Sequence, residues 1–281
     1  MKSLRFSAAI ALILWVCLAL PVPAWAQDYR IVHEVWSQYQ RITVRDTAEG
    51  YRQLIFDAKL DGTDAIQSEM SLSDRSRLTL PYSRTMMTAL PAAAKLGRVL
   101  IVGLGGACMQ RYLRKLLPET TIETVEIDPE VRRVAAEYFD FKEDERQIVH
   151  IADGAEFMAA SKEKYDIIFL DAFGAEEIPG PLKTAEFFTA VKNRLAEGGV
   201  ACANLWHGSS DYSGIVKTYG TVFVEQYLVR CGSFSGNTIL LALPVKADLG
   251  FKGWIERAEA FEKKHPTGLD LPGLIKQGAV R

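Results

Sequence analysis

The chain has 281 residues, of which 48% are hydrophobic and 24% are charged. A chain of this length can bury a full core as one large domain or as one domain with a small appendage. Its 33 Lys and Arg residues nearly balance 35 Asp and Glu residues, and no block of Lys or Arg stands out, so the sequence argues against an electrostatic grip on nucleic acid.

Residues 1–26 have the pattern of a secretory signal peptide. Two basic residues precede an apolar run over 8–20, which is too short to span a bilayer comfortably, and the small-x-small sequence AWA ends at Ala26. We predict cleavage there and an exported mature protein, periplasmic or secreted, that starts at Gln27 and has no stable membrane span. An uncleaved membrane anchor is the alternative.

Three cysteines remain in the mature chain, Cys108, Cys202 and Cys231. An odd number without CxxC spacing indicates neither a zinc site nor a disulfide framework, so we expect no bound metal. One disulfide between two of the three stays open, because an exported protein meets an oxidising compartment.

The pattern from residue 29 to 80 is strand-like and rich in turns, which predicts a small domain of β-hairpins over 27–82. A helical segment over 82–96 leads into alternating strands and helices. The expected strands are 98–102, 122–126, 148–151, 165–170 and 200–205, and the expected helices are 109–117, 129–139, 155–161 and 184–195.

This alternation predicts an α/β fold, with a Rossmann-like doubly wound and mostly parallel sheet over 83–245. The last two strands, 223–230 and 238–243, have a short connection and should form an antiparallel hairpin at one edge. Residues 246–281 are expected to form one helix around 254–264 and an irregular tail.

A glycine-rich turn follows the first strand of that sheet, where doubly wound folds bind their ligands. Gly103, Gly105 and Gly106 lack a Cβ and would let backbone amides approach a ligand closely. A dinucleotide fingerprint would have a third glycine at the position of Cys108, so the turn disfavours NAD. A purely structural turn is the alternative.

Acidic residues end the next three strands of the predicted sheet. Glu126 ends the second strand, where a carboxylate accepts both hydroxyls of a ribose. Asp153 ends the third and suits an adenine amine, with Gly154 giving room for the flat ring. Asp171 ends the fourth, central strand and faces the reactive end of the ligand. A solvated cap or a helix N-cap is the structural alternative for such acids.

The chain resembles the spermidine synthase-like proteins, which have the fold of S-adenosylmethionine-dependent methyltransferases. The similar motifs are VLIVGLGGA, TVEIDPEV, ADGAEFM, YDIIFLDAF and LAEGGV, preceded by LDGTDAIQSE with Gln67 and LPYSRTMM with Tyr82. The resemblance covers roughly residues 35–245. It implies a small β-domain packed over a Rossmann-like domain, a pocket between the two, and in most members a homodimer.

This resemblance implies a transferase that uses S-adenosylmethionine or decarboxylated S-adenosylmethionine and a small amine acceptor. Asp171 would be the base or the electrostatic partner of the amine, and Tyr82 and Gln67 would orient the acceptor. Trp206 and His207 follow the fifth strand and are expected to line the pocket, although an ordinary loop histidine is an equal alternative for His207.

Two positions differ from the pattern of the aminopropyltransferases in this family. Gly174 stands where they carry a second acid that holds a polyamine ammonium, and Arg84 follows Tyr82 and Ser83 where they carry an acid. A cation at Arg84 would repel a diamine and suit a carboxylate on the substrate, which counts against polyamine synthesis.

Export leaves two other functions open, because adenosylmethionine is a cytoplasmic metabolite. One is an exported enzyme that reuses the acidic pocket without the nucleotide and moves a proton on a small amine or a peptide terminus. The other is a protein that binds polyamines or nucleosides without turning them over. Consumption of a substrate distinguishes the enzymes from the binding protein.

Overall fold

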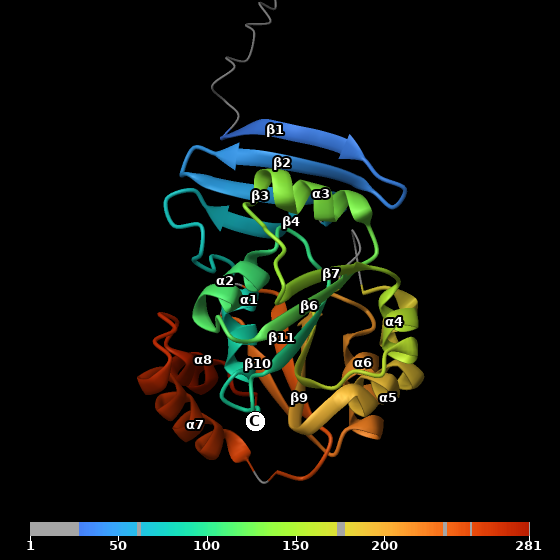
Figure 1. Cartoon of the computed structure of the whole chain (residues 1–281), viewed down its shortest axis with the longest axis vertical. Coiled ribbons are helices and arrows are strands. Elements are labelled where there is room, and N and C mark those ends of the chain that lie inside the picture. The colour runs from blue at the N-terminus through green and yellow to red at the C-terminus, as the bar shows by residue number, and fades with distance from the viewer. Residues whose placement is uncertain (1–27, 61–62, 173–177, 233–234, 248, 281) are drawn as a thin grey trace, which may run out of the picture.

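The computed structural model describes residues 28–60, 63–172, 178–232, 235–247 and 249–280. These residues form a four-stranded sheet near the N-terminus and a seven-stranded sheet flanked by helices (Figure 1). The predicted signal peptide, the turn at 61–62 and Gly174 lie outside the described residues. The predicted α/β fold with a separate N-terminal β-domain is confirmed.

The N-terminal sheet is an antiparallel meander whose strands turn an apolar face toward the rest of the molecule. Its order is β1 (Tyr29–Trp36), β2 (Arg41–Thr47), β3 (Tyr51–Leu60) and β4 (Thr63–Ser71). Side chains alternate between the two faces of a strand, and Ile42 and Val44 on β2 are fully buried. They belong to one apolar cluster with Val131 and Val134 of helix α3 (Pro129–Tyr138), so this sheet covers a helix of the second domain.

The seven-stranded sheet is parallel in its centre and antiparallel at one edge. Its order is β10 (Glu225–Arg230), β11 (Asn237–Leu243), β9 (Leu195–Trp206), β8 (Tyr165–Leu170), β5 (Arg98–Val102), β6 (Thr121–Glu126) and β7 (Gln147–Ile151). The strands from β9 to β7 run parallel, while β10 and β11 form the predicted antiparallel hairpin. Strand β8 is buried at every residue, as expected for a central strand covered on both faces.

Helices cover both faces of the larger sheet (Figure 1). One apolar layer contains α1 (Pro81–Met86), the short helix η2 (Met87–Ala89), α2 (Cys108–Leu116), α7 (Gly250–Lys264) and α8 (Leu271–Gly278). The other contains α4 (Gly154–Ala160), η3 (Gly180–Lys183), α5 (Ala185–Arg194) and α6 (Tyr212–Val222). Both faces of the sheet are therefore buried, which leaves the ends of its strands as the place for a binding site.

The helix expected over 82–96 is shorter in the structure. Helices α1 and η2 end at Ala89, shortly before Pro91. Proline has no N–H for a helical hydrogen bond, so the helix does not continue through this position. The predicted domain boundary at residue 82 consequently falls inside α1, which packs with the larger sheet.

The sequence pattern predicts an irregular C-terminal tail, but the structure has a second helix there, α8. Asp270 accepts a hydrogen bond from the Gly273 N–H and caps α8, which begins with Leu271 and Pro272. The indole N–H of Trp254, on α7, donates to the carbonyl oxygen of Thr88 at 2.8 Å. The segment after residue 246 is therefore part of the Rossmann-like domain.

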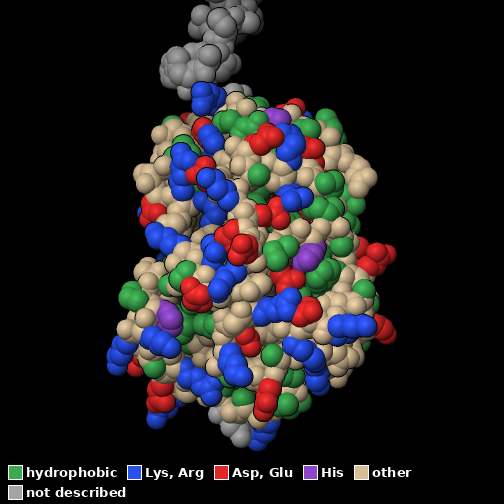
Figure 2. Space-filling model, viewed as in Figure 1, with side chains coloured by type: hydrophobic (Ala, Val, Ile, Leu, Met, Phe, Trp, Pro, Cys, Tyr) green, Lys and Arg blue, Asp and Glu red, His purple; other side chains and the backbone are tan. Residues whose placement is uncertain are grey.

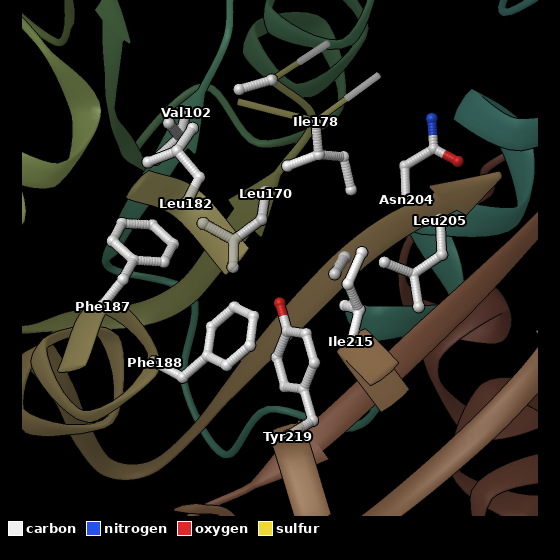
Figure 3. A pocket seen from close by; sticks show the side chains of 12 residues that line it. Val102, Leu170, Ile178, Leu182, Phe187, Phe188, Asn204, Leu205, Ile215 and Tyr219 are labelled. Atoms are coloured by element: carbon white, nitrogen blue, oxygen red, sulfur yellow. The ribbon is translucent and has the colours of Figure 1, made fainter. Parts of the chain in front are cut away.

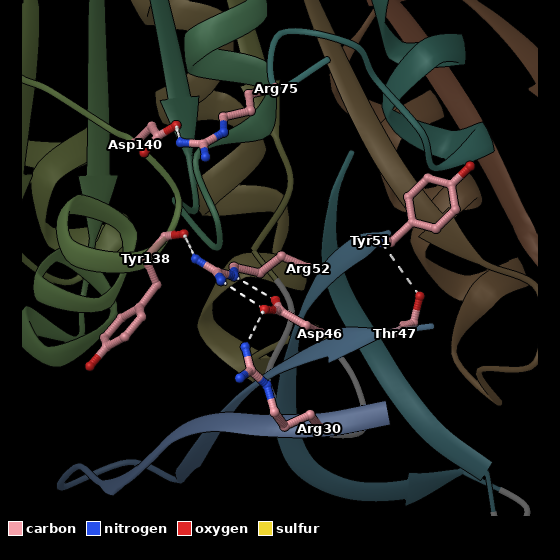
Figure 4. Close-up of polar contacts among 8 residues, drawn as sticks. All are labelled: Arg30, Asp46, Thr47, Tyr51, Arg52, Arg75, Tyr138 and Asp140. Carbon is pink, nitrogen blue, oxygen red and sulfur yellow. Dashed lines mark hydrogen bonds and ion pairs between the residues drawn. The ribbon is translucent and has the colours of Figure 1, made fainter. Parts of the chain in front are cut away.

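An ion-pair network joins the N-terminal sheet to this domain (Figure 4). Arg52 on β3 donates to the Asp46 carboxylate from Nε at 2.7 Å and from Nη2 at 2.9 Å. Its Nη1 donates to the carbonyl oxygen of Tyr138, at the end of α3, at 2.9 Å. Arg75 and Asp140 form a second ion pair across the same junction. These contacts position the N-terminal sheet over the strand ends.

The cysteines are free rather than paired. Cys202 and Cys231 are buried in the apolar layer that contains α7, and Cys108 is partly buried at the start of α2. The question of a disulfide among these three residues, which the sequence left open, is thus answered for the described chain.

The described surface carries mixed charge. On the face shown in Figure 2, basic and acidic side chains are interspersed. Ion pairs of the described residues include Arg114 with Asp144 and Arg132 with Glu143. Within the described ranges, no helix combines the length and the apolar character that a bilayer crossing requires.

Candidate functional site

A cavity of about 610 Å³ lies at the carboxyl ends of the parallel strands, beneath the N-terminal sheet. The loops after β5, β6, β7 and β8 form one wall, and β4 and α1 form the other. Its volume is typical of pockets that enclose a small ligand. The predicted site residues that line it are Gln67, Tyr82, Gly103, Gly105, Glu126, Asp153, Gly154, Asp171 and Trp206.

Close packing on two sides dictates the glycine-rich turn. Gly103 has a φ of +105°, and a Cβ there would collide with the carbonyl oxygen of Asp171. Gly105 has a φ of +52°, and a Cβ there would lie 2.7 Å from Ser68 Oγ. The same hydroxyl accepts a hydrogen bond from the Gly106 N–H at 2.8 Å. The turn therefore needs glycine for its backbone conformation and for its contacts with β4 and β8.

Two backbone amides hold Glu126 at the end of β6. Oε2 accepts from the Leu104 N–H at 2.9 Å, and Oε1 accepts from the Asp128 N–H at 2.9 Å. Burial raises the pKa of this carboxyl group, and the two hydrogen bonds oppose that shift. A carboxylate oxygen has two lone pairs, so the group can still accept hydrogen bonds from ligand hydroxyls.

Asp153 is both a helix cap and a cavity residue. Its Oδ1 accepts hydrogen bonds from the N–H groups of Ala155 at 2.7 Å and Glu156 at 3.0 Å, so the N-cap interaction is present. The glycine that follows has a packing reason, because a Cβ on Gly154 would lie 2.9 Å from Val102 Cγ1. Room for a ligand ring is therefore not needed to explain Gly154.

Asp171 lies at the end of β8 between two hydrogen-bonding side chains. Asn204 on β9 donates from Nδ2 to Oδ1 at 3.0 Å, and the Tyr82 hydroxyl is the second partner. That hydroxyl also lies 3.1 Å from the carbonyl oxygen of Gln67, so its single proton has two acceptors. Burial raises the pKa of Asp171 to about 7, although both hydrogen bonds oppose the rise. A carboxyl group with this pKa can exchange protons near neutral pH.

A small apolar pocket of about 20 Å³ adjoins the cavity behind the end of β8 (Figure 3). Leu170 and Ile215 are among the apolar side chains around it, and the hydroxyl of Tyr219 points into it. Phe188 stacks on Tyr219 with ring centroids 3.8 Å apart. Leu170, Phe188, Ile215 and Tyr219 belong to the apolar layer that contains α5 and α6.

Three predicted site residues are not among the described residues that line the cavity. Arg84 lies two residues after Tyr82 on α1, and residues at that spacing point to different faces of a helix. His207 is exposed and stacks on Tyr212 with ring centroids 4.3 Å apart. Gly106 is buried under β4. The direct substrate contacts predicted for Arg84 and His207 stay predictions, and the described lining residues lend them no support.

Several polar residues of the cavity escaped the sequence analysis. Asn237 on β11 donates from Nδ2 to Oδ1 of Asn204 at 2.9 Å, and Ser235 donates to Oδ1 of Asn237 at 3.1 Å. A chain of hydrogen bonds therefore leads from Ser235 to Asp171. A polar residue inside the apolar run of β9 was the available signal for Asn204. Others include Tyr39, Gln40 and Glu69, which come from the N-terminal sheet and its turn.

The cavity is acidic. Among the described residues that line it, Glu69, Glu126, Asp153 and Asp171 are acidic, and none is Lys, Arg or His. A cleft lined by one sign of charge concentrates ligands of the opposite sign. The cavity therefore favours cationic groups and disfavours a carboxylate.

Known proteins share both the sequence pattern and the fold. The spermine/spermidine synthase domain matches residues 81–240. The polyamine aminopropyltransferase of Vibrio vulnificus is 36% identical over 216 residues, which cover 76% of this chain and 72% of that protein. The chain belongs to the spermine/spermidine synthase family. The resemblance inferred from the motifs is therefore confirmed, and so is the prediction of a transferase family.

Solved structures agree on the architecture. A probable spermidine synthase from Corynebacterium glutamicum is 20% identical, covers 81% of this chain and 87% of its own, and has a TM-score of 0.67. Human methyltransferase-like protein 13 in complex with SAH is 26% identical, covers 66% of this chain and 92% of its own, and has a TM-score of 0.61. The first similarity shows the fold alone, and both place the chain among Rossmann-like methyltransferase folds.

Proposed function

We propose that this family member is an aminopropyltransferase, with decarboxylated S-adenosylmethionine as donor and a small amine as acceptor. The observation that carries the proposal is the cavity at the strand ends, with four acids and no basic residue among its described lining residues. Two relatives support it. The protein from Vibrio vulnificus is named a polyamine aminopropyltransferase, and the human methyltransferase-like structure holds SAH.

The residues of the parallel-sheet wall fit an adenosyl nucleotide. Glu126 would accept the ribose hydroxyls, because it lines the cavity and accepts a hydrogen bond from Leu104 of the glycine-rich turn. Asp153 would accept a hydrogen bond from the adenine amine through the oxygen that does not cap α4. These roles follow from position and from the acceptor chemistry of carboxylates.

The charge of the cavity favours the decarboxylated nucleotide over S-adenosylmethionine itself. Intact S-adenosylmethionine carries a carboxylate, which would meet Glu69 and Asp171 and no basic partner among the described lining residues. An unpaired carboxylate in a partly buried site is costly. The decarboxylated form keeps only positive groups, the sulfonium and an ammonium.

Asp171 would prepare the acceptor for attack. When bound, the donor supplies a sulfonium whose carbon–sulfur bond breaks readily. Ionised Asp171 accepts a proton from the acceptor ammonium, and Tyr82 and Asn204 keep the carboxylate in place. The free amine forms a bond to the aminopropyl carbon, the carbon–sulfur bond breaks, and its electron pair stays on sulfur as a thioether.

Binding and transfer are tested on the mature protein. Calorimetry should show tighter binding of decarboxylated S-adenosylmethionine and methylthioadenosine than of S-adenosylmethionine. Mass spectrometry should then detect aminopropylated 1,4-diaminobutane. A folded protein that binds none of these nucleotides would overturn the proposal. Tighter binding of intact S-adenosylmethionine together with methyl transfer would replace it by a methyltransferase.

We also propose that the protein is exported and begins at Gln27, on the pattern of residues 1–26. The donor must then be supplied outside the cytoplasm, or the protein must meet it before export. Mass spectrometry of the mature protein from a secreting culture should give a mass that starts at Gln27. An intact Met1 in the soluble exported fraction would contradict this.

A further inference from the structure

Glu69 is the cavity acid to which no role has been given above. It lies on β4, two residues after Gln67, and both residues line the cavity. Ser68, between them, is buried and also lines the cavity, where its hydroxyl accepts a hydrogen bond from the Gly106 N–H. Glu69 is therefore close in the chain to the Gln67 carbonyl oxygen, which accepts a hydrogen bond from the Tyr82 hydroxyl at 3.1 Å.

A cross-strand ladder holds the Glu69 carboxylate in place. Glu69 pairs with Gln53 on β3, which pairs with Arg45 on β2. Gln53 donates from Nε2 to Oε2 of Glu69 at 2.8 Å and accepts from Arg45 Nε at 2.8 Å. Among the described residues, Gln53 is the one donor to this carboxylate, so Oε1 keeps its lone pairs for a ligand.

The glycine-rich turn beside Glu69 cannot supply a charged side chain. A Cβ on Gly106 would lie 2.9 Å from both Ser68 Cβ and a Phe139 ring carbon, and Gly105 meets the Ser68 hydroxyl. The Cys108 thiol, which follows the turn, contacts the Glu69 carbonyl oxygen at 3.4 Å. Burial raises the pKa of this thiol, and the Glu69 charge adds to the rise. Glu69 is therefore the carboxylate that the N-terminal sheet contributes next to the turn.

We propose that Glu69 binds the primary ammonium at the end of an alkyl chain in the cavity. This inference rests on the proposed function, which brings two such ammonium groups to the site, one on the donor nucleotide and one on a diamine acceptor. Glu69 is a binding residue for the substrate, whereas Asp171 takes the proton. An ammonium paired with a carboxylate in a partly buried site forms a charge-assisted hydrogen bond, which is stronger than a neutral one.

Replacement of Glu69 by Gln removes the charge but keeps an oxygen that can accept from Gln53. We expect Glu69→Gln to bind methylthioadenosine, which has no ammonium, as wild type does, within roughly twofold. It should lose about ten- to hundredfold in affinity for decarboxylated S-adenosylmethionine if the ammonium belongs to the donor. A loss of the same size in the affinity for 1,4-diaminobutane, measured by direct titration, would show instead that Glu69 binds the ammonium of the acceptor.

Glu34→Gln is the matched control, because Glu34 lies on β1 of the same sheet, is exposed and pairs with Arg41 at 3.9 Å. It should change none of the three affinities. Equal behaviour of Glu69→Gln and wild type toward both ammonium ligands, whether both bind or neither binds, overturns the inference. If the variant behaves as wild type does, and wild type still binds methylthioadenosine and transfers the aminopropyl group, the proposed function stands but the role of Glu69 does not.

Discussion

The parallel-sheet wall of the cavity differs from the wall made by the N-terminal sheet and α1 in how its side chains are held. Glu126 and Asp153 accept hydrogen bonds from backbone amides of their own loops. Tyr82 and Glu69 instead depend on β3 and β4, and these strands are docked by Arg52 across a junction between two sheets.

This difference separates two tasks within one cavity. Backbone amides fix the first wall as soon as the parallel sheet forms, so it suits the part of the ligand that does not vary. The second wall depends on how the N-terminal sheet is docked, so changes in β4 or α1 should affect the alkyl-ammonium parts of the ligands more than the adenosine. Variants in either wall test whether the two tasks are separate.

The largest effect is expected from Asp171→Asn, which keeps the shape of the side chain but cannot accept the proton. The transfer rate should fall by about 10²- to 10⁴-fold, the usual contribution of a general base. Steady-state kinetics with saturating nucleotide measures it. Full activity in this variant would remove Asp171 from the mechanism.

Stability provides the control for that variant. The folded-state pKa of Asp171 is about 7, above its ordinary value of 3.8. The folded protein therefore holds a proton that the unfolded chain has lost between these values, and its stability falls as pH rises through this interval. Asp171→Asn should remove this loss, so its melting temperature near and above pH 7 should equal or exceed that of wild type. Loss of fold would instead assign Asp171 a structural role.

Glu126→Ala removes the carboxylate that would accept the ribose hydroxyls of the nucleotide. Losing hydrogen bonds to a charged acceptor should weaken methylthioadenosine binding by about 1.5 to 3 kcal/mol. Glu130→Ala, which removes an acid from the first turn of α3, serves as the control and should bind normally. Calorimetry of both variants measures the difference. Equal affinities would show that the ribose is held elsewhere.

The two walls also differ in what the sequence could predict. Parallel strands end at one edge of a sheet, so the order of elements alone places Glu126, Asp153 and Asp171 together. Glu69 could not be placed in this way. Glu69 reaches the cavity only because the N-terminal sheet docks over the strand ends. The pattern of a single sequence does not predict how two sheets dock. Helix phase likewise decides that Arg84 turns away from the side that carries Tyr82.

Arg52→Met tests the docking of the second wall. The variant keeps an apolar stem but loses three hydrogen bonds, two to Asp46 and one to the Tyr138 carbonyl. We expect a loss of about 1 to 2 kcal/mol in unfolding free energy and a weaker acceptor affinity at nearly unchanged nucleotide affinity. Arg30→Met is the control, because Arg30 contacts the same carboxylate at 3.5 Å with a side chain that is 80% exposed. Parallel loss of both affinities would contradict a separable wall.

Asn204→Leu changes the pKa of Asp171 without removing its carboxyl group. The Asn204 hydrogen bond lowers the pKa of Asp171, so its loss should raise that pKa above about 7. The rising limb of the pH–rate profile should move to higher pH by about one unit, which corresponds to one hydrogen bond to a charged group. Asn237→Leu, one step further along the chain, should cause a smaller shift. An unmoved profile would mean that another group limits the rate.

The smallest effect is expected from Arg84→Ala, and it sharpens the boundary of the second wall. Arg84 is partly buried in the last turn of α1 and is not among the described residues that line the cavity. A substitution away from a site usually changes free energies by about 0.5 kcal/mol or less, so the KM for 1,4-diaminobutane should stay within roughly twofold. If the variant instead binds the diamine much more tightly, the guanidinium repels cations in the cavity, and polyamines are the wrong class of acceptor.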